Sequence, residues 1–81
     1  MEIRQGSVVI AKAGRDKGKA FAVLCVENRR TVWIADGKSR PLEHPKRKNI
    51  IHLQATSAAV DCITTNRQLQ QFLKSFSQEV I

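Results

Sequence analysis

Two apolar runs flank a short charged segment in the first third of the chain. Residues 7–12 and 20–26 are rich in β-branched and other apolar side chains, which favours strands. The segment between them, residues 13–19, contains Gly14 and Gly18, and glycine permits positive φ angles and close approach of the backbone to a ligand. The pattern predicts a β-hairpin with a basic loop. The cations of this loop are Arg15, Lys17 and Lys19.

Three more short strands are predicted in the middle of the chain. Residues 31–35 form the third, which ends at Asp36-Gly37, a dipeptide typical of a tight hairpin turn. Residues 38–42 return as the fourth strand, at an edge of the sheet or ending early because Pro41 cannot donate to a ladder. Residues 49–53 form the fifth. Five short, curved strands favour a small barrel.

The last third of the chain has a helical period. Four apolar residues spaced i, i+3, i+4 and i+7 predict a helix whose buried stripe covers an open end of the barrel. These residues are Leu69, Phe72, Leu73 and Phe76. Thr65 is the predicted N-cap, and Gln68 completes the pattern of a capping box. Residues 57–63 fit either a short helical turn or a strand.

The length and the charge of the chain narrow the classes of function. The 81 residues predict one small domain that buries only about 60% of its unfolded surface, too little for a large catalytic cleft. Of the 14 lysines and arginines, 12 lie in the first 50 residues with 5 of the 7 acids, so the net charge of +7 belongs to the strand-rich part. This excess is typical of a nucleic-acid-binding face. An acidic protein or an anionic membrane would attract the same charge.

The sequence lacks the motifs that several kinds of chemistry require. No nucleophile lies beside a base, and no phosphate loop precedes a helix, so we expect neither an enzyme nor a cofactor. Cys25 and Cys62 have no paired spacing and are expected to be reduced, with Cys25 a small hydrophobe in its strand. His44 and His52 do not cluster with them, so no metal site is predicted. The chain shows no signal peptide and no membrane span, which predicts a cytoplasmic protein.

The basic residues of the strand-rich part form two groups. The first decorates the first hairpin and consists of Lys12, Arg15, Lys17 and Lys19. The second decorates the fourth predicted strand and the segment after it, and consists of Lys38, Arg40, Lys46, Arg47 and Lys48. In a small barrel the two groups can share one face, where their summed potential would concentrate a polyanion. A merely solvated surface is the alternative, which the uncompensated charge disfavours.

Three further residues near these groups have two interpretations each. If Val32 and Ile34 point inward, Trp33 faces the opposite side, either beneath the helix, which we favour, or in solvent as a base-stacking platform. His52 is expected to face outward on the fifth strand, where it either donates a hydrogen bond to a phosphate or is a surface residue without a role. Asp16 is expected to cap backbone amides of its turn rather than to touch a ligand.

Residues 6–23 resemble the KOW motif, which consists of a strand, a basic loop containing glycine and a second strand. Gly14 matches the central glycine of the motif. The motif is shared by several large-subunit ribosomal proteins and by transcription elongation factors, where it lies in an SH3-like barrel and commonly contacts RNA or protein. The resemblance extends through residues 34–43 and 45–54 to short bacterial KOW proteins similar to ribosomal proteins.

The resemblance implies a mainly β fold, an SH3-like five-stranded barrel with a C-terminal helix packed against it. We expect a single domain over residues 1–81, with the barrel over 4–54 and a helical extension over 55–81. The implied function is noncatalytic binding of an RNA backbone, foremost ribosomal RNA, with ribosomal proteins as further partners. A protein-interaction module of the SH3-like type is the alternative, disfavoured because aromatic residues are scarce. The candidate RNA-binding residues are Lys12, Gly14, Arg15, Lys17, Gly18, Lys19, Lys38, Arg40, Lys46, Arg47, Lys48 and His52.

Overall fold

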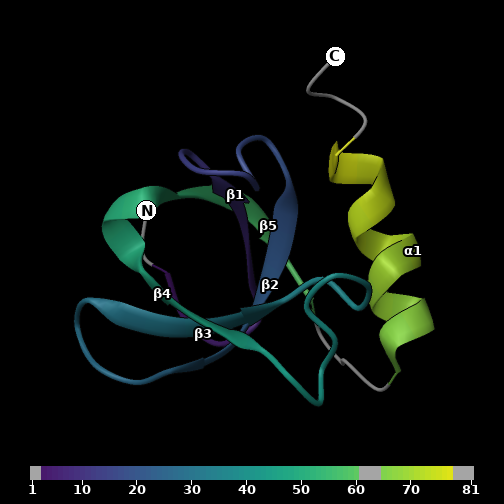
Figure 1. Ribbon diagram of the computed structural model, residues 1–81, viewed down its shortest axis with the longest axis horizontal. Coiled ribbons are helices and arrows are strands. Elements are labelled where there is room, and N and C mark those ends of the chain that lie inside the picture. Colours follow the sequence, from purple (N-terminus) through teal and green to yellow (C-terminus); the bar gives the residue numbers. More distant parts are fainter. Residues whose placement is uncertain (1–2, 61–64, 78–81) are drawn as a thin grey trace.

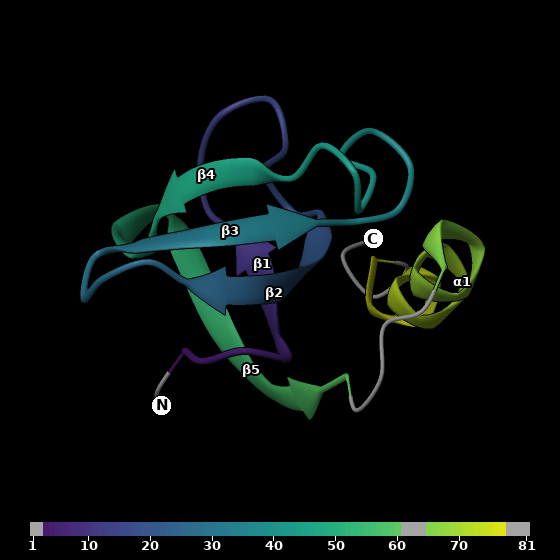
Figure 2. The same ribbon diagram turned by 90° about the horizontal axis from the view of Figure 1, so that it is seen from below.

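Five antiparallel strands form one strongly curved sheet, and a single helix lies beside it (Figures 1 and 2). The computed structural model describes residues 3–60 and 65–77; Cys62 and the end of the predicted helical extension lie outside this part. The elements are β1 (Ser7–Ala11), β2 (Ala20–Val26), β3 (Thr31–Ala35), β4 (Lys46–Asn49), the short 3-10 helix η1 (Ile50–His52), β5 (Leu53–Ala59) and α1 (Asn66–Ser77). The mainly β class with a C-terminal helix is thus confirmed.

The strands follow the order β4-β3-β2-β1-β5 across the sheet, and every neighbouring pair is antiparallel. β4 and β5 are the two edges, and no ladder joins them within the described residues, so the sheet is open. Figure 1 shows how the sheet nevertheless curls round on itself. η1 connects the two edge strands, and the side-chain oxygen of Asn49 caps it by accepting a hydrogen bond from the Ile51 N–H at 3.0 Å.

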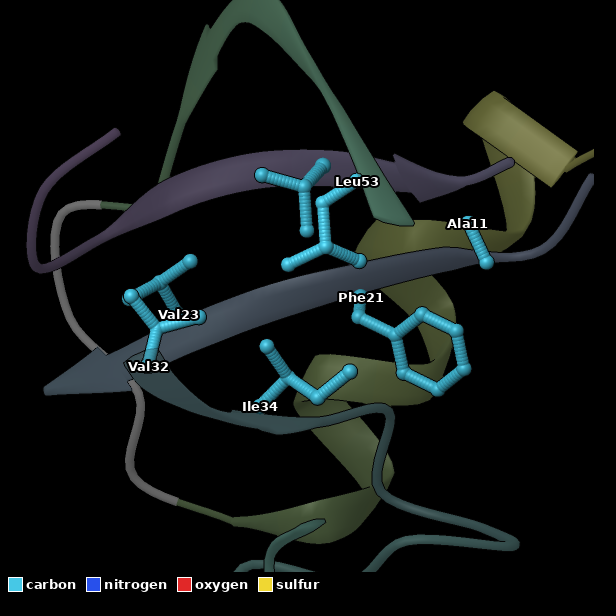
Figure 3. Packing of buried hydrophobic residues seen from close by; sticks show 7 residues of the cluster. Ala11, Phe21, Val23, Val32, Ile34 and Leu53 are labelled. Carbon is cyan, nitrogen blue, oxygen red and sulfur yellow. The ribbon is translucent and has the colours of Figure 1, made fainter. Parts of the chain in front are cut away.

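Alternate residues of four strands fill the inner side of the curved sheet. The period of two along a strand places them on one side. The buried residues of this inner core are Val9, Ala11, Phe21, Val23, Val32, Ile34 and Leu53 (Figure 3). Burying a branched aliphatic or phenylalanine side chain stabilises a fold by about 1.5–3 kcal/mol, so this core is a main source of stability for the sheet.

α1 covers part of the outer side of the sheet, so β1 and the first half of β2 are buried on both sides. Leu69 and Leu73 are 2% and 3% exposed and belong to one cluster with three alanines of β2 and β3. These alanines are Ala20, Ala22 and Ala35. Because their side chains are small, the helix can approach the strands closely. Burial on both sides explains why the first two strands read as nearly continuous apolar runs.

The start of α1 agrees with the prediction, but one residue of its apolar stripe does not. The Thr65 hydroxyl accepts a hydrogen bond from the Gln68 N–H at 3.1 Å, which confirms Thr65 as the N-cap. Phe76 is partly buried against the outer cluster. Phe72 is 37% exposed, with its ring centroid 5.4 Å from that of Phe76, so its assignment to the core is wrong. The helix meets the sheet through Leu69 and Leu73, which leaves Phe72 at the rim.

The structure corrects the position of the fourth strand. Residues 38–42 lie in a loop, and β4 begins only at Lys46, after Pro45. Pro41 has no N–H for a ladder, whereas the all-polar β4 pairs with β3 along its whole length. Pairing with β3 therefore makes this segment a strand although its side chains have a low propensity for strands.

The fifth strand is also shifted toward the C-terminus. Residues 50–52 of the predicted strand form η1, and β5 continues to Ala59, beyond the end predicted for the barrel at Gln54. Of the two alternatives for residues 57–63, the strand is confirmed as far as Ala59, and residues 61–63 lie outside the described part. Within the described residues, no helix has the length and apolar character needed to cross a lipid bilayer.

Cys25, which was expected to act as a small hydrophobe in its strand, has an exposed side chain. The register between β2 and β3 shifts between Val23 and Cys25, so that Cys25 pairs with Trp33. Such a bulge breaks the alternation along the strand. Cys25 therefore shares the side of Trp33 and not that of the inner core.

Candidate nucleic-acid interface

The loop between β1 and β2 is a closed, hydrogen-bonded turn with exposed cations. The Gly18 N–H donates to the Ala11 carbonyl at 2.8 Å, and the Ala11 N–H donates to the Lys19 carbonyl at 3.0 Å. Gly14 has a φ of +82°, and a Cβ built there would meet no atom within 4 Å, so the backbone at the loop tip is open to a ligand. The basic side chains of this loop, all exposed, are Lys12, Arg15, Lys17 and Lys19.

The role predicted for Asp16 is wrong. Its carboxylate lies 3.8 Å from Nζ of Lys19 and caps no backbone amide of the described loop. The turn is closed by main-chain bonds, with the Lys19 N–H donating to the Asp16 carbonyl at 2.9 Å. The acid instead offsets part of the charge of Lys19.

The loop between β3 and β4 is closed by Asp36, not by the predicted tight hairpin turn. The Asp36 carboxylate accepts hydrogen bonds from the N–H groups of Lys38 and Arg40, both at 2.8 Å. The Arg40 carbonyl in turn accepts the N–H groups of Asp36 at 2.9 Å and Gly37 at 3.1 Å. An aspartate that binds the amides following it favours such a local turn. The loop therefore turns back on itself before β4 begins.

Polar contacts fix the β3–β4 loop to the first turns of α1. Asn66 accepts the Leu42 N–H at 2.7 Å and donates to the Glu43 carboxylate at 2.7 Å. The hydrogen bond from Asn66 is the main cause that lowers the pKa of Glu43. The Gln70 amide donates to the Gly37 carbonyl at 2.8 Å. A Cβ on Gly37, whose φ is +82°, would overlap the Asn66 carbonyl oxygen, so this close approach needs glycine.

The topology brings both loops to one end of the sheet. β1 and β3 each run antiparallel to β2 between them, so the loops that follow β1 and β3 leave from the same end. The Lys12 N–H donates to the His52 carbonyl at 2.8 Å, which joins η1 to this end. We call it the loop end, and its candidate residues are Lys12, Gly14, Arg15, Lys17, Gly18, Lys19, Lys38, Arg40 and His52.

The remaining three candidates lie on β4 and point to different sides of the sheet. Lys46 and Lys48 are half-buried opposite Ile34 and Val32, on the side of the inner core. At this edge strand their aliphatic stems can cover core side chains while the ammonium groups reach water. Arg47 lies opposite Trp33, on the outer side. The second basic group of the sequence is therefore divided by the fold.

Arg47 forms an ion pair on the outer side. Its Nη2 lies 2.7 Å from one carboxylate oxygen of Glu27, and its Nε lies 3.1 Å from the other. This two-point contact lowers the pKa of Glu27 and raises that of Arg47. The Trp33 indole N–H also donates to Glu27, at 3.0 Å. We call Glu27, Trp33 and Arg47 the outer patch.

The side predicted for Trp33 is confirmed, but its favoured packing beneath the helix is wrong. Trp33 faces away from Val32 and Ile34, is half-buried, and does not belong to the cluster under α1. Its indole N–H donates to a carboxylate at the surface. The amphipathic ring therefore has a partner for its polar group without being fully buried.

A cleft of about 520 Å³ between the loop end and α1 adds residues that the sequence analysis did not select. Its lining includes Lys19 and Lys38 from the two loops and Arg67 and Lys74 from the helix. In the sequence the helical segment has no net charge, so its composition does not indicate a binding role for its two cations. The spacing of Arg67 and Lys74 by seven residues, on one helix side, is the signal that could have indicated them.

No protein-family model matches the chain. A search of curated proteins finds no match either. Among the described residues, no group of three or more histidine, cysteine, aspartate or glutamate side chains could hold a metal ion.

Proposed function

We propose that this protein is a noncatalytic RNA-binding module that holds an RNA backbone at its loop end. The curved five-stranded sheet and the basic glycine loop between its first two strands support an SH3-like barrel of the KOW type. By the same resemblance, ribosomal RNA is the proposed partner, with ribosomal proteins next to it. The proposed site comprises the two loops and His52.

The observation that carries this proposal is the collection of unpaired cations at one end of the sheet. Lys12, Arg15, Lys17 and Lys38 are exposed and make no ion pair with any described carboxylate. They come from two loops that main-chain and Asp36 hydrogen bonds hold in place. A preorganised surface loses little conformational freedom on binding, so its charge is available to a polyanion.

Binding through such cations acts by releasing counterions from the phosphates. Each neutralised phosphate contributes a slope of about 0.7 to 0.9 to the fall of log affinity against log salt concentration. Backbone contacts of this kind position a protein on RNA without reading a sequence. We therefore expect weak sequence selectivity and a steep dependence on salt.

Fluorescence anisotropy tests the proposal with a labelled structured RNA, measured across a range of salt concentrations. A polyglutamate chain of equal charge is the matched control polymer. We expect the RNA to bind more tightly than polyglutamate, with a salt slope that corresponds to several phosphates. RNA binding that hardly changes with salt would contradict the mechanism, and equal affinity for polyglutamate would favour the protein-interaction alternative.

Sedimentation of a cell lysate through a density gradient tests the ribosomal partner separately. We expect the protein to travel with the large ribosomal subunit, and to leave that fraction when the salt concentration is raised. If the protein sediments with other RNA, the RNA-binding proposal stands and the ribosomal assignment fails. If it stays at the top of the gradient at low salt, the ribosomal assignment also fails.

A further inference from the structure

The cleft between α1 and the loop end is walled by positive charge on two sides. Lys19 and Lys38 line it from the loops, and Arg67 and Lys74 line it from the helix. Of these four, Lys19 has an acidic neighbour, the Asp16 carboxylate at 3.8 Å, and the other three make no ion pair with a described carboxylate. Asp36 is the one acid among the lining residues, and its carboxylate is occupied by two backbone amides. The cleft is therefore strongly cationic.

The helix presents a polar stripe to this cleft and not a random mixture of side chains. Arg67, Gln70, Gln71 and Lys74 are spaced i, i+3, i+4 and i+7, so they lie along one side of α1. Gln70 is held by its hydrogen bond to the Gly37 carbonyl, which fixes the distance between the helix and the loop. Gln71 is exposed, and its amide has no hydrogen-bond partner among the described residues.

We propose that this cleft takes one nucleotide unit of a single RNA strand, an extension of the proposed RNA-binding function on which it rests. The phosphate lies between the cations of the loops and those of the helix. The Gln71 amide faces the polar edges of the nucleotide, and Ala20 and Leu73 form the apolar base of the cleft. α1 is then part of the recognition surface and not only a cover for the sheet.

The size of the cleft favours a single strand over a duplex. A volume of about 520 Å³ falls in the range of about 300–1,000 Å³ typical of sites for small organic ligands, a class that includes a nucleotide. The whole molecule measures only 29 × 28 × 23 Å, and the walls of the cleft are the helix and the β3–β4 loop, which the Gln70–Gly37 hydrogen bond joins. An RNA duplex shows its phosphates on a broad, convex surface and cannot place one between these walls.

The experiment compares two double variants that remove the same charge from different places. Arg67→Gln with Lys74→Gln removes the helix cations, and Arg29→Gln with Arg30→Gln removes two exposed cations from the turn between β2 and β3. Affinity for a labelled single-stranded oligouridylate and for an RNA duplex of equal length is measured by anisotropy across salt concentrations. Circular dichroism melting checks that each variant is folded, and Arg67→Lys with Lys74→Arg serves as the charge-conserving variant.

For the oligouridylate, we expect the helix variant to lower the salt slope by about 0.7, the contribution of one phosphate on a single strand, which corresponds to about fivefold weaker binding at 0.1 M salt. The turn variant should change the slope little, and the charge-conserving variant should bind like the parent. The helix variant should weaken binding of the duplex less than binding of the oligouridylate. An equal loss of affinity in the helix and turn variants would overturn the cleft proposal but leave the RNA-binding function standing. The same holds if the helix variant weakens binding of the duplex and of the oligouridylate equally. If the parent protein binds neither RNA, the proposed function fails and the cleft proposal fails with it.

Discussion

The loop end and the outer patch both contain basic residues on an exposed surface, yet they differ in what those residues face. At the loop end, Lys17 and Lys38 have no ion pair with a described carboxylate. In the outer patch, Arg47 is held at 2.7 Å by Glu27, which also accepts the Trp33 N–H. The difference shows that the number of cations in a segment does not define a binding surface. The fold decides which of them keep an uncompensated charge.

The largest expected effect comes from the packing that holds α1 beside the loop end. Leu73→Ala should lower the free energy of unfolding by about 2–5 kcal/mol, because Leu73 is buried in the outer cluster. Phe72→Ala, on the exposed rim of the same helix, should cost clearly less. Thermal or urea denaturation measures both. If the Leu73→Ala variant does not fold, Leu73→Met should fold and lose less than about 1.5 kcal/mol. A larger loss for Phe72→Ala than for Leu73→Ala would mean that the helix packs through a different side.

A smaller loss of stability is expected where the β3–β4 loop meets the helix. Gly37→Ala puts a side chain at a φ of +82° and against the Asn66 carbonyl, so the backbone must shift. The positive φ alone costs roughly 1–2 kcal/mol. Gly14→Ala is the matched control, since its φ is also +82° but no atom lies within 4 Å of the added Cβ. Equal melting temperatures for the two variants would show that the loop and the helix are not in close contact.

The comparison of the two basic regions is tested by removing one cation from each. Lys17→Gln should lower the salt slope of RNA binding by about 0.7 to 0.9, or about five- to eightfold in affinity at 0.1 M salt. Arg47→Gln should change RNA binding little, because Glu27 already compensates its charge. Anisotropy with one structured RNA measures both variants. A stronger effect of Arg47→Gln would place the RNA on the outer patch.

The smallest effect concerns the ionisation of Glu27. Its pKa lies below the ordinary value of 4.5, first because of the Arg47 hydrogen bond and second because of the Trp33 hydrogen bond. Since the folded pKa is below the unfolded one, the stabilisation is present above the unfolded pKa and is lost as the pH falls through the folded pKa. Because Glu27 is exposed, the change in stability should be slight. A carbon-13 NMR titration should show the pKa of Glu27 rising toward 4.5 in Arg47→Gln. An unchanged pKa would contradict the ion pair between Glu27 and Arg47.

Patterns within one segment predicted much of the fold. The β1–β2 hairpin, the Thr65 cap and the burial of Leu69 and Leu73 follow from a period of two or of 3.6 and from local hydrogen bonds. The position of β4 could not be predicted from such a pattern, because its residues Lys46–Asn49 have no apolar alternation. They form a strand only through pairing with β3. The exposure of Cys25 likewise depends on a bulge in β2, which the apolar run around it does not indicate.

The candidate site was predictable in part for the same reason. The basic loop around Gly14 lies within one hairpin, so its residues could be selected from the sequence. The cleft joins Lys19, Lys38 and Arg67, which are far apart in the chain and meet because α1 packs on the sheet and because Asn66 and Gln70 fix the β3–β4 loop to α1. The separation of Arg47 from Lys46 and Lys48 also depends on β4 pairing with β3.

The most direct test of the central claim is an NMR titration that follows the backbone amides while a structured RNA is added. We expect the largest shifts at residues 12–19 and 36–40, with little change at residues 26–31, which form the opposite end of the β2–β3 hairpin. The parent spectrum at high salt, where phosphate contacts weaken, is the control. Shifts concentrated at Glu27, Trp33 and Arg47, or no shifts at the loop end at a concentration where the RNA is bound, would contradict the loop end as the RNA-binding surface.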